Sequence, residues 1–254
     1  MTAAGKVWLV GAGPGDPELL TIRAHRLLAS ARVVAYDELV APEILAVAPA
    51  GAERIPVGRR AHGCRHHDAR IHPLVVERAL LGQDVVRLKG GDPMVFGRGG
   101  EEAEELARSG IAFEVVPGIS AALGAAATAN IPLTHRGCAA SVTWVTAHAA
   151  EGDADIFANV TQRGTLVFYM GLGRIDDTCR TLIAGGRARS TPAAVVSRAT
   201  LPDAQVIVGT IADIAVLASA ARAQSPAVLI VGDVVARRVQ PEPRVDAGEH
   251  VVGL

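Results

Sequence analysis

Aromatic residues, cysteines and net charge are all scarce in this sequence. Aromatics supply only 3% of its 254 residues while half are hydrophobic, so the core has to be built mainly from Ala, Val, Leu and Ile. This length is enough to bury a substantial core in one or two domains. The formal net charge is −1, which argues against the broad positive field of a nucleic-acid-binding protein, so we expect no nucleic-acid partner.

Cysteine pairs and long apolar runs are missing as well. Cys64, Cys138 and Cys179 are odd in number and form no C-x-x-C pair, which favours a reducing compartment over a disulfide framework. The apolar stretch near the N-terminus, VWLV, is too short for a signal peptide. Other apolar runs are interrupted by Gly, Pro, Asn or Arg, so no membrane span is expected. We therefore expect a soluble, cytoplasmic protein without a membrane partner.

Short β-branched runs alternate with longer Ala- and Leu-rich stretches, a pattern typical of an α/β protein. The strands predicted in the first half are 6–10, 32–35, 85–88 and 113–116, and the helices are 17–29, 71–81 and 99–109. The strands predicted in the second half are 141–146, 165–169, 193–196, 206–208 and 228–231. The stretch ATLPDAQVIVGT predicts two strands joined by a Leu-Pro-Asp turn.

The character of the sequence changes around Pro117. The stretch ISAALGAAATANI that follows Gly118 predicts a buried helix of small residues, which we take as the joint between two halves. We therefore expect an N-terminal α/β domain over 1–117 and a C-terminal α/β domain over 118–236. Residues 237–254 lack periodicity and are expected to form a tail.

The glycine-rich stretch GAGPGD after the first predicted strand suggests a dinucleotide loop, but one position argues against it. Asp16 stands where the third glycine of G-x-G-x-x-G is expected, and its charge would repel a pyrophosphate. No G-K-[ST] follows, so a Walker A loop is excluded. A cationic ligand with hydroxyls and no phosphate, such as S-adenosylmethionine, fits the loop better.

A related pattern occurs twice, in GPGDPELL and KGGDPMVF. Asp16 and Asp92 are predicted to cap helices that begin at Pro17 and Pro93. Ordinary strand-to-helix turns explain the Asp-Pro pairs, but not the glycines before them. Glycines at such places either supply a positive φ or let a ligand approach the backbone.

Several longer motifs carry a family resemblance. They are VWLVGAGPGDPELLT, AYDELV, VVRLKGGDPMVFGRGGEEAEEL, VVPGISAALGAAATANIPLTHR, LVFYMGL and SPAVLIVGDVV, in this order over about 6–235. Together they resemble the uroporphyrinogen-III C-methyltransferases of the tetrapyrrole methylase family. The resemblance implies a two-domain α/β fold distinct from Rossmann methyltransferases, an active-site cleft between the domains, and a homodimer.

The resemblance also implies a reaction. Two methyl groups would pass from S-adenosylmethionine to C2 and C7 of uroporphyrinogen III, through precorrin-1 to precorrin-2, in sirohaem, cobalamin or haem d1 biosynthesis. Fused sirohaem synthases carry an extra dehydrogenase/chelatase part, and a chain of this length is expected to be the methylase alone. A precorrin-4 methylase is the nearest alternative within the family, disfavoured by Tyr36 and Asp37.

Site residues follow from the resemblance position by position. The residues implied to bind the cofactor are Pro14, Gly90, Gly91, Asp92, Val95, Ser120, Ala121, Met170, Ala199 and Ala227. Asp37 is implied to accept the proton that the ring system loses. The alternative interpretation of Asp37 is a helix N-cap after the second strand, and the two roles are compatible.

The substrate carries eight carboxylates, so a locally basic surface is expected. Residues 54–70 hold five arginines and three histidines against one aspartate. Arg59 stands where the family usually has a lysine assigned as proton donor. A guanidinium is a poor acid, so we interpret Arg59, with Arg60, as a carboxylate clamp that occupies this catalytic position, and Met94 as a further substrate contact. A solvated charged loop is the alternative.

Other functions remain open at this point. The spacing of His62, His66, His67 and His72 around Cys64 fits no closed tetrahedral site, so no metal is expected. His135 and His148 are expected to be structural or lining residues. A nucleotide-dependent oxidoreductase is disfavoured by Asp16, and a non-catalytic tetrapyrrole carrier would not need both glycine loops.

Overall fold

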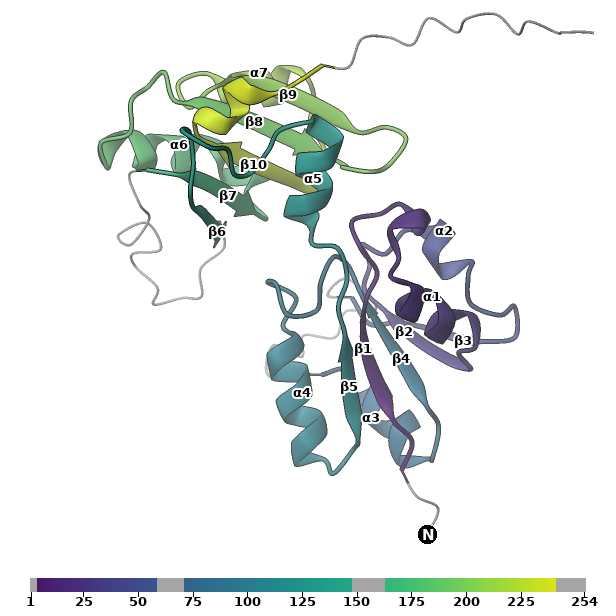
Figure 1. Ribbon diagram of the computed structural model, residues 1–254. Coiled ribbons are helices and arrows are strands. Elements are labelled where there is room, and N and C mark those ends of the chain that lie inside the picture. Colours follow the sequence, from purple (N-terminus) through teal and green to yellow (C-terminus); the bar gives the residue numbers. More distant parts are fainter. Residues whose placement is uncertain (1–3, 59–70, 148–162, 241–254) are drawn as a thin grey trace, which may run out of the picture.

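The computed structural model describes residues 4–58, 71–147 and 163–240, and within them the chain forms two five-stranded sheets (Figure 1). The first holds β1–β5 and the second β6–β10. Helix α5 (Ala121–Ala129) follows directly on the last strand of the first sheet and packs on the second. The expected α/β class is confirmed.

The first sheet is parallel throughout, in the order β3-β2-β4-β1-β5. Its strands are β1 (Val7–Gly11), β2 (Val33–Tyr36), β3 (Glu53–Pro56), β4 (Val85–Lys89) and β5 (Phe113–Val116). Helices α1 (Ile22–Ala29) and α2 (Pro42–Leu45) cover one face, and α3 (Pro73–Leu80) and α4 (Gly99–Arg108) cover the other. Helices on both faces explain why the central strands β1 and β2 are nearly continuous apolar runs.

Four strands of this sheet lie within one residue of their predicted bounds, but the first predicted helix is wrong. Pro17–Leu19 form only a 3₁₀ turn, η1, and Leu20 is extended. The side chain of Thr21 then accepts a hydrogen bond from the amide of Ala24 and caps α1. A good N-cap residue inside the predicted helix therefore divides it.

The second sheet is mixed, in the order β6-β7-β10-β8-β9. Its strands are β6 (Val142–Thr146), β7 (Thr165–Tyr169), β8 (Pro192–Ser197), β9 (Gln205–Thr210) and β10 (Ala227–Val231). Strands β6 and β7 are parallel, and the other pairs are antiparallel. The prediction of two strands in ATLPDAQVIVGT is wrong for its first half, because Ala199 and Leu201 belong to the turn between β8 and β9.

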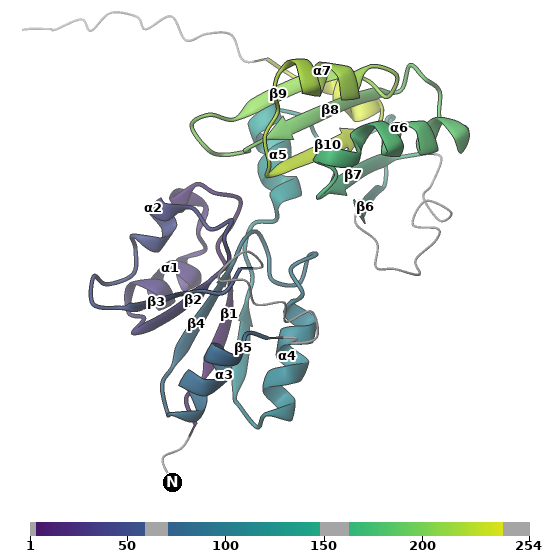
Figure 2. The same ribbon diagram turned by 180° about the vertical axis from the view of Figure 1, so that it is seen from behind.

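The two faces of the second sheet are covered differently (Figure 2). Helix α5 and the 3₁₀ segment η4 (Asp233–Arg237) pack on one face, while η3 (Leu172–Arg174), α6 (Ile175–Ala184) and α7 (Ile214–Ala220) pack on the other. Ala122, Ala125 and Ala129 of α5 are fully buried, which confirms the predicted small-residue helix. Small side chains let a helix lie close against its neighbours.

Hydrogen bonds link the first loop to the second sheet. The amide of Asp16 donates to Oγ1 of Thr200 at 3.1 Å, and the amide of Thr200 donates to Oγ1 of Thr128 in α5 at 3.0 Å. Pro14 lies against Gly124 of α5, where an added Cβ would come within 2.6 Å of the proline ring. The glycine-rich loop of β1 is thereby held against α5. In the described ranges no helix has the length and hydropathy needed to cross a bilayer.

Candidate active site at the carboxyl ends of the first sheet

The loops after β1, β4 and β5 meet at the carboxyl edge of the first sheet. Gly13 and Gly91 exchange two backbone hydrogen bonds, of 3.1 and 2.8 Å. An added Cβ at Gly11 would lie 2.5 Å from the amide nitrogen of Gly118. Gly13 and Gly91 also have positive φ angles of 73° and 67°. These glycines are therefore required by the chain's own close packing and backbone conformation.

Gly90 differs from its neighbours. Its φ is not in the left-handed region, and an added Cβ would meet only the Cβ of Leu39, at an ordinary 3.7 Å. Nothing in the described chain requires a glycine here, yet the sequence places one beside Leu39, in the turn that follows Asp37. Gly90 thus leaves bare main chain where a ligand can approach, as the sequence analysis expected of this loop.

Asp92 fixes the backbone of this edge. Its Oδ1 accepts a hydrogen bond from the amide of Met94 at 2.8 Å, and its Oδ2 accepts one from the amide of Gly118 at 3.0 Å. The prediction of a helix beginning at Pro93 is wrong, because α4 begins only at Gly99. Asp92 caps a turn instead, and it joins the β4 loop to the segment before α5.

Asp16 is an N-cap, as the sequence predicts. Its Oδ1 accepts from the amide of Glu18 at 2.9 Å, with Pro17 at the first position of η1. It caps a short 3₁₀ turn rather than a long helix.

Ser120 and Ala121 lie next to the β4 loop and are held by Tyr169. The Ser120 Oγ and Tyr169 Oη are 2.7 Å apart, and the amide of Ala122 donates to the same Tyr169 oxygen at 3.2 Å. An added Cβ at Gly91 would lie 3.6 Å from the amide of Ala121. Burial raises the pKa of the Tyr169 hydroxyl, which keeps it a protonated hydrogen-bonding group.

The remaining predicted cofactor residues divide into two groups. Val95 and Ala199 pack on the same cluster as α5, and Met170, directly after Tyr169, is half exposed with a strained φ of 55°. Ala227 packs instead on the cluster of the opposite face of the second sheet, with α6 and α7. The structure therefore brings the predicted residues together except for the side chain of Ala227.

Asp37 does not cap a helix, because α2 begins at Pro42 with Ala41 as its N-cap. The interpretation of Asp37 as an N-cap is wrong. Its carboxylate instead accepts a hydrogen bond from Arg87 Nη2 at 2.6 Å, and its other oxygen lies 4.0 Å from Lys89 Nζ. Its side chain keeps 30% of its surface exposed, so it stays accessible to a ligand.

Sequence reasoning missed three charged residues beneath Asp37. Arg87, Lys89 and Glu102 are only 4%, 2% and 5% exposed. Glu102 Oε1 accepts from Arg87 Nη2 at 2.9 Å and from Lys89 Nζ at 2.7 Å. The spacing of Arg87 and Lys89, two cations at i and i+2 on one face of an otherwise apolar strand, was the available signal.

The pKa values of the two cations move in opposite directions. Burial and the neighbouring Arg87 charge lower the pKa of Lys89, against the pull of its carboxylates. Burial opposes ionisation of Arg87 as well, but Asp37 and Glu102 outweigh it and raise the Arg87 pKa. Arg87 is therefore the fixed positive charge of the cluster.

Several predicted site residues lie outside the described residues. These are Arg59, Arg60, His62, Cys64, His66, His67 and His148. Of their neighbours, His72 caps α3 through its Nδ1, which accepts from the amide of Leu74 at 3.3 Å. Met94 is exposed beside Asp92. In the part of the chain that is described, no three His, Cys, Asp or Glu side chains gather as a metal site would require.

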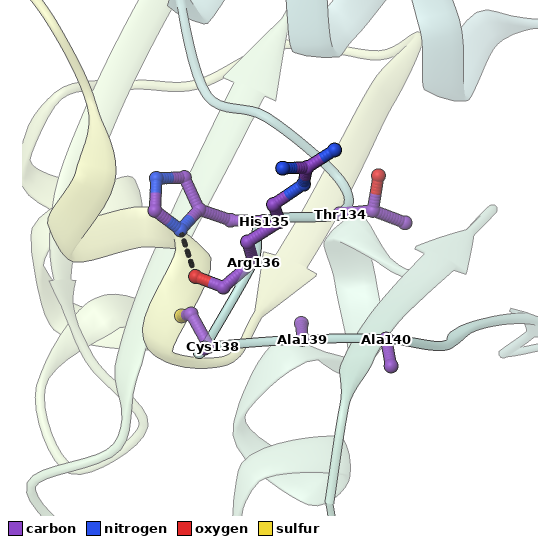
Figure 3. A pocket seen from close by; sticks show the side chains of 7 residues that line it. Thr134, His135, Arg136, Cys138, Ala139 and Ala140 are labelled. Atoms are coloured by element: carbon purple, nitrogen blue, oxygen red, sulfur yellow. Dashed lines mark hydrogen bonds between the residues drawn. The ribbon is translucent and has the colours of Figure 1, made fainter.

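A pocket of about 530 Å³ is lined by residues 134–140, which belong to the segment that connects α5 to β6 (Figure 3). His135 and Arg136 both line it, and His135 Nδ1 lies 2.8 Å from the carbonyl oxygen of Arg136. That His135 has a structural or lining role rather than a catalytic one stays a prediction. Arg136 adds a cation that the sequence analysis did not single out.

Comparison with known proteins shows which family this chain belongs to. The profile described as Tetrapyrrole (Corrin/Porphyrin) Methylases matches residues 6–215. The chain belongs to the tetrapyrrole methylase family. This confirms the resemblance read from the motifs and the fold expected from it.

Two solved tetrapyrrole methylases share the fold. The uroporphyrin-III C-methyl transferase of Thermus thermophilus in complex with S-adenyl homocysteine is 41% identical, with a TM-score of 0.80 and 96% and 99% of the two chains covered. A cobalt precorrin-4 methyltransferase is 26% identical, with a TM-score of 0.79, and the match covers 91% of this chain and 95% of that one.

Curated relatives of this tetrapyrrole methylase are longer. A siroheme synthase of Pseudomonas fluorescens is 50% identical over 94% of this chain and 52% of its own length. A siroheme synthase of Pseudomonas putida is 51% identical over 92% of this chain and 51% of its own. The chain spans about half the length of the curated relatives it matches.

Proposed function

We propose that this chain transfers two methyl groups from S-adenosylmethionine to C2 and C7 of uroporphyrinogen III, giving precorrin-2 through precorrin-1. The observation that carries the proposal is that Gly90, whose main chain is left bare, lies against Leu39, two residues after Asp37, whose carboxylate is held by buried cations. The likeness to the Thermus thermophilus enzyme, which was solved with the demethylated cofactor, supports it.

The residues around Gly90 fit S-adenosylmethionine. Gly90, Gly91 and Asp92 present backbone groups at the strand edge, and Ser120 and Ala121 line the adjoining segment. Pro14, Val95, Met170 and Ala199 complete the set, and Ala227 contributes at most its main chain. When bound, S-adenosylmethionine supplies an electrophilic methyl group, so the chain's main task is alignment.

Asp37 is the proton acceptor in this proposal. The pyrrole carbons at C2 and C7 carry no hydrogen, so when one of them takes the methyl group and S-adenosylhomocysteine leaves, the ring system must lose a proton from another position to become neutral again. Arg87 holds the carboxylate of Asp37 at 2.6 Å, while 30% of the side chain remains open. An ionised, oriented carboxylate that remains accessible is what a general base requires.

We assign the recognition of the substrate's carboxylates to arginine side chains. The eight carboxylates of uroporphyrinogen III suit guanidinium forks, which bind a carboxylate through two hydrogen bonds. Arg59 and Arg60 fill this role from the basic stretch, with Met94 exposed beside the cofactor loop. Arg136, in the pocket near α5, offers a further carboxylate contact.

A methylation assay tests the proposed function. The purified chain is incubated anaerobically with uroporphyrinogen III and S-adenosylmethionine, and the products are separated by mass. The proposal expects precorrin-1 followed by precorrin-2. Binding of the tetrapyrrole without methylation would indicate a carrier, and methylation of a later precorrin instead would indicate the function of the 26% identical relative.

The proposal extends to the assembly and cell biology that the resemblance implies. We propose two α/β domains over 1–117 and 118–236 with the active site between them, a homodimer, and a cytoplasmic location. Light scattering of the purified chain tests the dimer directly.

A further inference from the structure

The buried charges beneath Asp37 form a connected chain. Arg87 and Lys89 extend from one face of β4, and Glu102 reaches them from α4. Arg87 Nη2 alone contacts two carboxylates, Asp37 at 2.6 Å and Glu102 at 2.9 Å. Lys89 Nζ binds Glu102 at 2.7 Å and lies 4.0 Å from Asp37.

Fold stability does not explain this cluster. Removing charges from water costs several kcal/mol per ion, and apolar residues of similar size often replace a buried ion pair without loss. On the same face of the sheet, two residues before Arg87 on β4, the packing is apolar: Val85 lies in one cluster with Leu9 and Leu106. A fold that needed only packing here had apolar residues available, so the charges point to a role at the site.

The positive charge of the cluster faces Asp37. Arg87 is the fixed positive charge of the cluster, and its Nη2 lies between the carboxylates of Glu102 and Asp37. The guanidinium thus faces the Asp37 carboxylate at its buried end, while the outer surface of Asp37 stays open. In the described residues the charged groups facing Asp37 are Arg87 and Lys89 from β4, with Glu102 of α4 behind them.

Two atoms of the cluster have no hydrogen-bond partner in the described residues, Arg87 Nε and Glu102 Oε2. Both are buried, and each unmet hydrogen bond costs free energy. The side chains therefore keep an arrangement that favours contact with Asp37 over full hydrogen bonding among themselves.

We infer that Arg87 is a positioning residue for Asp37, and that Glu102 and Lys89 fix the Arg87 guanidinium in place. The inference rests on the proposed role of Asp37 as proton acceptor. Arg87 holds the carboxylate in one rotamer toward the substrate, without touching the substrate itself.

Kinetics of Arg87→Gln and Arg87→Lys test the inference. Removing the cation is expected to lower kcat by about 100-fold, the contribution of a well-placed general base, with KM for uroporphyrinogen III little changed. Arg87→Lys, which keeps the charge but loses the fork, is expected to lower kcat less than Arg87→Gln does.

A matched control removes an arginine from an exposed ion pair. Arg78 contacts Glu53 with two nitrogens on the protein surface, at the start of β3 and thus at the opposite end of the strands from the site, and Arg78→Gln is expected to keep wild-type kcat. Calorimetry with S-adenosylhomocysteine and circular dichroism are run on every variant. Should Arg87→Gln fail to fold, Arg87→Lys and Glu102→Gln carry the same test, since each perturbs the orientation of the guanidinium.

A double-mutant cycle separates this inference from the proposed function. In an Asp37→Asn background, Arg87→Lys is expected to have no further effect on kcat, because its target carboxylate is gone. Wild-type kcat in Arg87→Lys and Arg87→Gln, with kcat strongly reduced in Asp37→Asn, would overturn the positioning role alone. Wild-type kcat in Asp37→Asn would overturn the role of Asp37, and the inference with it.

Discussion

The hydroxyl groups of Ser120 and Tyr169 lie 2.7 Å apart and join the start of α5 to the end of β7. The same Tyr169 oxygen accepts the amide hydrogen of Ala122. The tyrosine ring also lies against Phe96, with ring centroids 4.8 Å apart. One side chain of the second sheet thus holds both the proposed cofactor segment of α5 and the turn after β4.

Tyr169→Phe removes the shared oxygen while keeping the ring contact. Ser120 Oγ and the Ala122 amide then lose a buried partner, so we expect unfolding to become easier by about 1 kcal/mol. The affinity for S-adenosylhomocysteine is expected to fall several-fold, because Ser120 and Ala121 are no longer fixed. Denaturant unfolding and calorimetry measure the two effects. Unchanged affinity would show that this bond does not support the cofactor segment.

Asp92→Asn tests the double hydrogen bond at the β4 loop. Asparagine can accept from one amide only, and its NH₂ group would face the amide of Gly118, itself a donor. We expect a loss of about 2 kcal/mol in stability and weaker cofactor binding. Asp16→Asn is the matched control, because Asp16 uses one oxygen and asparagine caps equally well. Equal effects of the two substitutions would contradict the assigned role of Asp92.

Cys179 is expected to be unreactive in the folded protein. Burial, with a smaller contribution from Asp176, raises the pKa of its thiol from 9.0 to about 11. A Cys64→Ser/Cys138→Ser variant, whose remaining thiol is Cys179, should resist iodoacetamide at pH 8 and react once unfolded. The raised pKa stabilises the fold below about pH 9, and this contribution should be lost as the pH rises toward 11. Fast labelling of the native variant would refute this.

Substitutions of Arg59 test whether this side chain binds a carboxylate of the substrate. The family usually has a lysine at this position, so Arg59→Lys is expected to keep activity, while Arg59→Ala should raise KM for uroporphyrinogen III because a carboxylate contact is lost. Steady-state kinetics at saturating S-adenosylmethionine provide the measurement. An unchanged KM in Arg59→Ala would refute the clamp.

The sequence predicted the regular elements better than the turns between them. β7 matches its predicted bounds because a continuous apolar run specifies a buried strand, and β5 matches because Phe113, Val115 and Val116 form a short β-favouring run that ends before Pro117. β3 and α2, each four residues long, give too short a pattern to be recognised. No helix begins at Pro93 because Asp-Pro also caps a turn, whereas α4 lies within one residue of the helix predicted over 99–109.

The candidate site was predicted unevenly for a physical reason. Motifs gave the cofactor loop and Asp37, since these are local in sequence. The partners of Asp37 are not local: Arg87 is 50 residues away and meets it only through the pairing of β2 with β4. The glycine pattern was also ambiguous, because close backbone packing at Gly11 and access for a ligand at Gly90 both require a glycine in the sequence.

The central claim is that the methyl donor lies on the bare main chain at Gly90, and calorimetry of Gly90→Ala with S-adenosylhomocysteine tests it most directly. The added methyl group meets only the Cβ of Leu39 at 3.7 Å, so the fold should be kept while the ligand's space is taken. Gly100→Ala is the control, since no atom lies within 4 Å of its added Cβ. We predict at least a tenfold loss of affinity, about 1.4 kcal/mol, in Gly90→Ala and none in Gly100→Ala. Wild-type affinity in a folded Gly90→Ala variant would contradict the account.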